Sequence, residues 1–92
     1  MSDPEYFEFI RSIVARVVRL LSHWPQEWMP LKVFEVQWVI TTGQLFETQR
    51  VGSALDFLLR MQQAAVIMMH HRDDGEYHLQ LHPRVAKRYP RL

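Results

Sequence analysis

The sequence predicts a mainly α-helical fold that ends in a small β-hairpin. Apolar side chains recur at helical spacing through the first 22 residues and again through residues 48–63. An apolar run then precedes Asp74-Gly75, and polar and apolar residues alternate strictly after it. Because Asp-Gly tolerates positive φ angles, it favours a tight hairpin turn. The predicted class is therefore three helices followed by a two-stranded hairpin.

Composition limits the protein to one small domain, which we place at residues 1–92. There is no cysteine, which excludes disulfides, thiolate metal sites and cysteine nucleophiles. The formal net charge of +1 permits nucleic-acid binding without requiring it. No apolar stretch is long enough to span a bilayer, and the first residues are acidic rather than basic. We therefore expect a cytoplasmic protein that does not bind membranes.

The N-terminal helix is predicted over residues 1–22. Asp3 is a suitable N-cap, Pro4 a suitable first helical residue, and Glu5 complements the helix dipole. The helix has an unusually wide apolar surface, which serves either one deep core or a core and a partner together. One stripe for the core comprises Tyr6, Phe9, Ile10, Ile13, Val17, Leu20 and Leu21. A second stripe, Phe7, Val14 and Val18, is predicted to form a homodimer interface, because soluble monomers avoid large exposed apolar patches.

A connector with two prolines and two tryptophans follows, and then residues 31–43 fit either a helix or a strand. We prefer the helix, since Pro30 can begin it and Gly43 can end it. The third helix is predicted to begin at the N-cap Thr48. Its expected buried face comprises Val51, Ala54, Leu55, Leu58 and Leu59.

A two-residue turn at Asp74-Gly75 would pair residue 71 with 78 and residue 69 with 80. A longer loop over residues 72–75 would shift the register by two residues and leave the two faces unchanged. One face of the hairpin would then carry Val66, Met68, His70, Tyr77, Leu79 and Leu81, and the other Ile67, Met69, His71, His78, Gln80 and His82. Residues 83–92 form a basic tail without acidic residues.

The run "TQRVGSALDFLLRMQQAAVIMMHHRDDGEYHLQ" resembles the winged helix-turn-helix superfamily. Members often place a valine, an alanine-leucine pair and a further leucine on the third helix, then a hydrophobic strand, a glycine turn and an aromatic residue. Residues 31–82 would form this core. One departure lies at the end of the third helix. The superfamily usually closes this helix with a glycine, and this chain has Gln62-Gln63-Ala64-Ala65 there. The matching residues are Val51, Ala54, Leu55, Leu58, Val66, Ile67, Gly75 and Tyr77.

The resemblance implies a small protein that binds double-stranded DNA, either a transcriptional regulator or an accessory factor in a DNA transaction. Residues 48–63 would be its recognition helix, because arginine and glutamine can pair with base edges. The residues expected to face a groove are Gln49, Arg50, Ser53 and Arg60. Those expected to neutralise phosphates are Arg72, Arg84, Lys87 and Arg88.

A second hypothesis is that the chain is a winged-helix protein-interaction module, an adaptor or inhibitor that does not bind DNA. Asp56 lies on the side of residues 48–63 that would face a DNA groove. The turn of the hairpin is acidic, because it carries Asp73, Asp74 and Glu76. These carboxylates would repel a phosphate backbone.

Metal-dependent and enzymatic functions are not expected. His71 and His78 would be cross-strand neighbours close enough to share an ion, but we interpret them as ordinary surface histidines. The sequence has no phosphate-binding loop, nucleophile elbow or His-Glu-x-x-His motif. We therefore predict no catalytic site, metal or cofactor.

Overall fold

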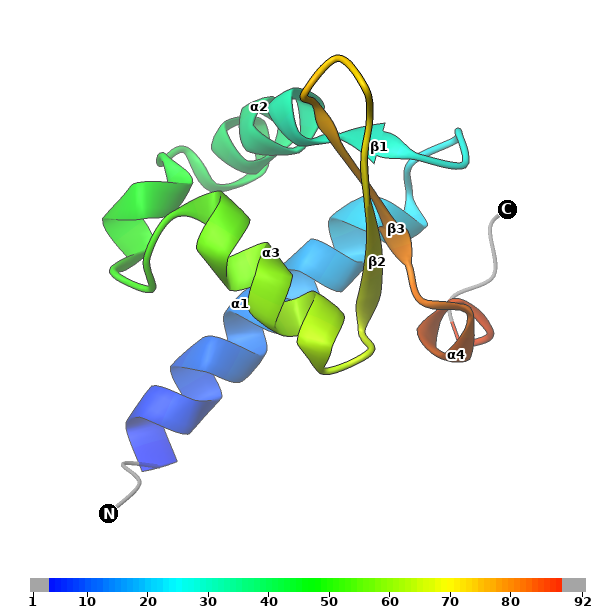
Figure 1. The fold of residues 1–92 in the computed structure, drawn as a ribbon. Helices are drawn as coiled ribbons and strands as arrows, with labels where there is room; N and C mark the ends of the chain where they lie inside the picture. The colour runs from blue at the N-terminus through cyan, green and yellow to red at the C-terminus, as the bar shows by residue number, and fades with distance from the viewer. Residues whose placement is uncertain (1–3, 89–92) are drawn as a thin grey trace.

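A computed structural model describes residues 4–88, in which helices pack around a small antiparallel sheet of three strands (Figure 1). The mainly α-helical prediction with a β-hairpin is confirmed. The elements in chain order are α1 (Pro4–Ser22), β1 (Met29–Pro30), α2 (Leu31–Thr42), the 3-10 helix η1 (Phe46–Gln49), α3 (Ala54–Gln63), β2 (Ile67–His71), β3 (Tyr77–Leu81) and α4 (Pro83–Ala86).

Helix α1 begins at Pro4, whose fixed φ and missing N–H suit a first helical position. The predicted N-cap, Asp3, lies outside the described residues. All buried side chains of α1 lie in its second half, and residues 4–12 contain none. In Figure 1 the N-terminal end of the helix accordingly extends past α3. The buried residues are Ile13, Val17, Val18 and Leu21.

The prediction of only two strands is wrong. Met29 pairs with Leu79 and Pro30 with His78, so the strand order is β1-β3-β2. Strand β1 has only two residues, and one is a proline without an N–H. Such a strand occurs only at a sheet edge and leaves almost no pattern in the sequence.

The helix predicted over residues 31–43 is confirmed. Pro30 is the N-cap of α2, and Gly43 ends the helix with φ +76°. The Gly43 N–H donates to the Val39 carbonyl at 2.7 Å. Glycine adopts this left-handed conformation without a Cβ clash, which explains the sharp end of α2.

The predicted start of the third helix at Thr48 is wrong. Residues 46–49 form η1 instead, and the Thr48 hydroxyl donates to the Leu45 carbonyl at 2.6 Å. The N-cap of α3 is Ser53, whose hydroxyl accepts the Asp56 N–H at 3.1 Å. Thr48 and Ser53 are both chemically suitable caps. The buried ring of Phe46 anchors η1 in the core, which keeps Thr48 within η1 and leaves Ser53 to cap α3.

The predicted hairpin register is wrong by one residue. Strands β2 and β3 pair His71 with Tyr77 and Met69 with Leu79. The loop has three residues, 73–75, because Arg72 and Glu76 still pair through the Arg72 N–H and the Glu76 carbonyl at 2.8 Å. A three-residue loop with a left-handed residue last is common in hairpins. The shift exchanges the faces: Ile67, Met69 and His71 lie with Tyr77, Leu79 and Leu81, and His70 lies opposite His78.

Two further expectations are corrected. The predicted tail begins with the short helix α4, capped by the His82 imidazole, whose Nδ1 accepts the Arg84 N–H at 3.1 Å. In α3, Leu59 is 36% exposed rather than buried, whereas Phe57 and Met61 are buried. None of the helices in residues 4–88 is long and apolar enough to cross a membrane.

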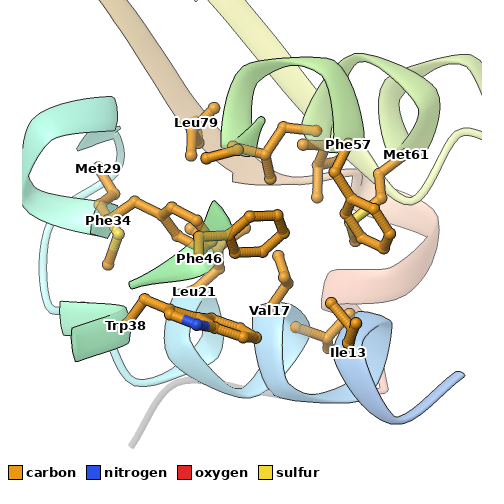
Figure 2. Close-up of a cluster of buried hydrophobic side chains, with 14 of the residues drawn as sticks. Ile13, Val17, Leu21, Met29, Phe34, Trp38, Phe46, Phe57, Met61 and Leu79 are labelled. Carbon is orange, nitrogen blue, oxygen red and sulfur yellow. The ribbon is translucent and has the colours of Figure 1, made fainter. Parts of the chain in front are cut away.

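The core is dominated by aromatic rings from three successive elements (Figure 2). The Phe46 ring lies 4.8 Å from the Trp38 ring and 5.5 Å from the Phe57 ring, measured between centroids. Phe34 lies 6.2 Å from Phe46. Tilted and edge-to-face rings at these distances attract one another beyond their apolar burial. Phe46 therefore joins α2 to α3.

We expect Phe46→Ala to lower the free energy of unfolding by about 3–5 kcal/mol, the range for deleting a buried phenylalanine. Chemical denaturation gives this value. The neighbouring Leu45→Ala is the matched control, because Leu45 is 60% exposed; it should change stability by less than about 0.5 kcal/mol. Equal effects of the two substitutions would contradict the described core.

Candidate functional site

The exposed face of α3 carries little positive charge. Its solvent-facing residues at helical spacing are Asp56, Leu59, Arg60 and Gln63. Ser53, predicted to face a DNA groove, is occupied as the N-cap. Arg60, in the last turn, is the basic residue of this helix. The face therefore combines one cation, one anion, one amide and a leucine.

The other predicted DNA-contacting residues of this region lie before α3, not on it. Gln49 is in η1, and its amide donates to the Gln44 side chain at 3.1 Å. Arg50 follows η1 in a left-handed conformation with φ +61°. Arg50 and Arg60 therefore lie near opposite ends of α3, and the structure does not gather them into one patch.

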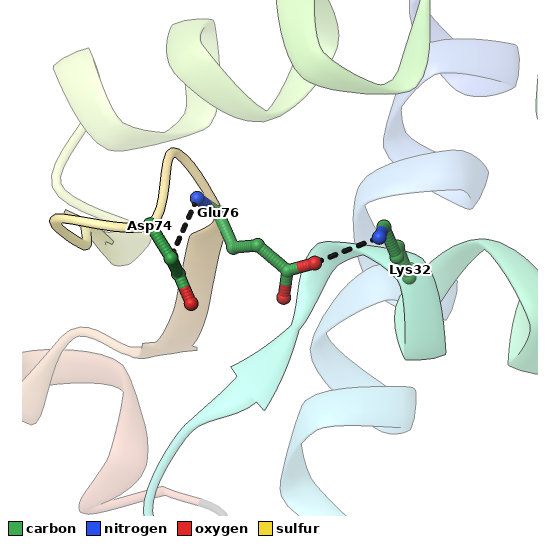
Figure 3. Close-up of polar contacts among 3 residues, drawn as sticks. All are labelled: Lys32, Asp74 and Glu76. Carbon is green, nitrogen blue, oxygen red and sulfur yellow. Dashed lines mark hydrogen bonds and ion pairs between the residues drawn. The ribbon is translucent and has the colours of Figure 1, made fainter.

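The hairpin tip is acidic (Figure 3). The Glu76 carboxylate lies 2.8 Å from the Lys32 ammonium at the start of α2. Asp74 Oδ1 accepts the Glu76 N–H at 2.9 Å, which fixes the turn. Asp73 and Asp74 are exposed. Arg72 therefore stands beside carboxylates that oppose any approach of a phosphate backbone.

The Lys32–Glu76 contact attaches the hairpin tip to α2. The hydrogen bond and charge of Glu76 raise the pKa of Lys32 above its ordinary value of 10.5. The ammonium is therefore charged at neutral pH, and on the alkaline side the contact is lost as the pH rises through the raised pKa of Lys32. Because Lys32 is exposed, the contact orients the tip more than it stabilises the fold.

Charge is distributed unevenly along the chain. Residues 31–82 contain four Lys/Arg and six Asp/Glu, whereas residues 83–92 contain four Lys/Arg and no acid. The part that would dock on DNA is thus net negative at neutral pH. Of the basic tail residues, Arg84, Lys87 and Arg88 are described, and all three are exposed.

One tail residue reaches α3. The Arg84 guanidinium donates to the Ala64 carbonyl, at the C-terminal end of α3, at 3.3 Å. This contact brings tail charge to the end of the helix that carries Arg60. It also satisfies a carbonyl that the end of the helix leaves without an intrahelical partner.

Helix α2 has an apolar outer face that the sequence analysis did not identify. Phe34 and Trp38 point into the core. On the opposite side, Val36 is 56% exposed, Ile40 is 67% exposed and Val39 is 36% exposed. Residues three and four apart on a helix are neighbours, so these three side chains form one surface. Apolar residues on both faces of one helix were the available signal, because such a helix cannot bury both against a single small core.

The residues predicted for a dimer interface separate into different environments. Val18 is only 6% exposed and belongs to the core, so its assignment to an interface is wrong. Val14 is partly buried against the core, and Phe7 is 53% exposed. The second apolar stripe of α1 is therefore buried in the core at Val18 and exposed to solvent at Phe7.

Comparison of the chain with protein-family models, with curated proteins and with solved structures found no match.

The histidines of the sheet are arranged differently from the prediction. His70 lies opposite His78, and its ring is 5.9 Å from that of Trp28. His71 stacks on Tyr77 at 4.4 Å. Residues 4–88 contain no group of three or more His, Asp or Glu side chains placed to hold a metal ion.

We therefore predict that excess zinc leaves the melting temperature unchanged. An ion bound only by the folded state would raise it by mass action. Calorimetry or a dye-based melt with and without zinc measures this directly. A zinc-dependent rise that disappears in both His70→Ala and His78→Ala would reveal a site formed by that cross-strand pair.

Proposed function

We propose that the chain is a winged-helix protein-interaction module, an adaptor or inhibitor that binds another protein through the outer face of α2. The observation that carries this proposal is the exposed apolar surface of Val36, Val39 and Ile40. Soluble monomers avoid such surfaces unless they are used for contact.

The winged-helix assignment is supported by the order of elements. Strand β1, which precedes α2, pairs with β3, the second strand of the hairpin that follows α3. The helices pack on one another through a shared core. The strand that completes this order, β1, lies just before the core predicted at residues 31–82. Since this fold serves both DNA and protein recognition, the surface rather than the fold has to decide between them.

The charge distribution favours a protein partner over DNA. Phosphate contacts supply most of the affinity of DNA-binding proteins, and they require lysine or arginine on the docking surface. Here Asp56 lies on the outer face of α3, and Asp73 and Asp74 lie at the hairpin tip. Both elements that a winged helix would place against a duplex therefore carry exposed carboxylates.

The outer face of α2 is well suited to binding a protein. Val36, Val39 and Ile40 are β-branched, so each loses little side-chain freedom when it is covered. Lys32 and Glu35, which are exposed at the N-terminal end of the same helix, supply a polar rim. We infer that the partner presents a complementary apolar surface.

Site-specific photo-crosslinking in the source cells tests this interface. A benzoylphenylalanine in place of Val36 should form a covalent adduct with one protein, and Ile40→Glu in the same chain should abolish that adduct. The matched control carries the probe in place of Thr41, which is exposed on the same helix but outside the apolar surface. Absence of an adduct at position 36, or equal adducts at both positions, would contradict the proposed interface.

DNA binding is a second candidate, favoured by the Arg84 contact with the end of α3. Arg60, Arg84, Lys87 and Arg88 would then act as phosphate contacts at one end of that helix.

Fluorescence anisotropy with duplex DNA separates the two candidates. On the protein-binding proposal, any binding at low salt should be weak, independent of DNA sequence and lost by about 150 mM salt, because few phosphates are contacted. Arg84→Gln should weaken it further. Tight binding that persists at this salt concentration, with a preference among sequences, would instead support the DNA hypothesis.

A further inference from the structure

A hollow lies beside the proposed interface, between the first turn of α2 and the hairpin tip (Figure 3). Its volume is about 300 Å³. Of the charged side chains in residues 4–88, Lys32, Asp74 and Glu76 line it, and Arg72 of the same hairpin does not. With two carboxylates and one ammonium, the hollow is net negative at neutral pH. Its remaining lining residues are Leu31, Gly75 and Tyr77.

The two carboxylates of the hollow share one cation. Glu76 lies 2.8 Å from the Lys32 ammonium, and Asp74 accepts the Glu76 N–H through Oδ1 at 2.9 Å. The hydrogen bond and charge of Glu76, and then the charge of Asp74, raise the pKa of Lys32 above its ordinary value of 10.5. Both carboxylates therefore act on the same ammonium, and their charge exceeds it. A second cation in the hollow would balance this excess.

Lys32 connects the hollow to the apolar outer face of α2. Its side chain lines the hollow and lies one helical turn before Val36, so the two are neighbours on the surface. Val39 and Ile40 continue the same side of the helix. The distance along α2 from Lys32 to Ile40 is about 12 Å. A partner segment that covers the apolar face therefore comes within reach of the hollow.

We propose that the partner covers α2 with an amphipathic helix and places an arginine side chain in this hollow. The inference rests on the protein-binding function proposed for the same face. A helix is favoured because the backbone groups in the middle of α2 are bonded within α2 and offer none to a neighbouring strand. An extended segment laid over Val36 and Ile40 would leave its own polar backbone groups against apolar side chains, whereas a helix bonds them internally.

Arginine suits the hollow better than lysine. A planar guanidinium presents several N–H donors, so it can bond to Asp74 and Glu76 together, and the face of the Tyr77 ring attracts it as well. A helix alongside α2 repeats its side chains at the same spacing as α2. The partner is therefore expected to carry arginine at position i and apolar residues at i+4, i+7 and i+8, which match Lys32, Val36, Val39 and Ile40.

Titration of the isotope-labelled chain with a synthetic stapled helical peptide tests this recognition by nuclear magnetic resonance. The probe peptide carries arginine at position i and leucine at i+4, i+7 and i+8, and the comparison peptide has neutral citrulline in place of the arginine. The arginine peptide should bind about threefold or more tightly than the citrulline peptide, because an exposed charge pair contributes modestly to affinity. It should shift the amide signals of Val36, Ile40 and Gly75.

Substitutions at the hairpin tip locate the source of this preference. Asp74→Asn should remove most of it, although the asparagine keeps the Oδ1 acceptor that fixes the turn. Asp73→Asn is the matched control, because it makes the same change at the same tip outside the hollow. Lys32→Gln should increase the preference, since it removes the competing cation. An arginine preference that survives Asp74→Asn, or the absence of any preference, would overturn the proposal.

The same titrations separate this inference from the proposed function. Ile40→Glu should abolish the binding of both peptides, because it places a charge on the apolar face that both need. If both peptides bind equally and both are lost in Ile40→Glu, the face is a contact surface and the arginine inference is wrong. If neither peptide binds while the photo-crosslinking probe at position 36 still forms its adduct, the partner is real and the helix inference is wrong.

Discussion

The packing of Phe46 against the rings of α2 and α3 is the contact on which the rest of the structure depends. Its ring lies 4.8 Å from Trp38 and 5.5 Å from Phe57. The Trp38 indole also has the Arg16 guanidinium of α1 6.0 Å from its ring centre, a distance at which a cation is attracted to the ring face. One aromatic cluster thus orients α1, α2, η1 and α3 together, and it forces the sequence around Phe46 into a short 3-10 helix rather than a longer α3.

This orientation determines which apolar side chains remain outside. When Phe34 and Trp38 face inward, helical geometry turns Val36 and Ile40 outward. A domain of 92 residues has a small interior, so the apolar side chains at the start of α1 also extend past it. Within residues 4–88, one apolar surface therefore lies on α2 and another lies between α1 and α3. Residues 31–82, in contrast, are net negative. This combination is the physical basis for proposing protein partners rather than DNA.

The elements that the sequence predicted correctly were those with strong local signals. Gly43 ends α2 because only a left-handed residue closes the helix there, and apolar periodicity located α1. The errors came from tertiary contacts. The loop at residues 73–75 has one residue more than the predicted Asp-Gly turn, which exchanged the faces of the hairpin. Ser53 caps α3 because the burial of Phe46 holds Thr48 in η1. The outer face of α2 was missed because a list of apolar positions does not say which face the core will cover.

We infer that the exposed apolar side chains of α2 form a contact surface. Methyl-labelled protein studied by nuclear magnetic resonance with a soluble paramagnetic agent measures their exposure one residue at a time. We expect the methyl groups of Val36 and Ile40 to be accessible to the agent in the isolated chain and to become protected when a partner is bound. Methyl groups of Val36 and Ile40 that are shielded in the isolated chain, or that stay equally accessible when a partner is bound, would contradict this interface.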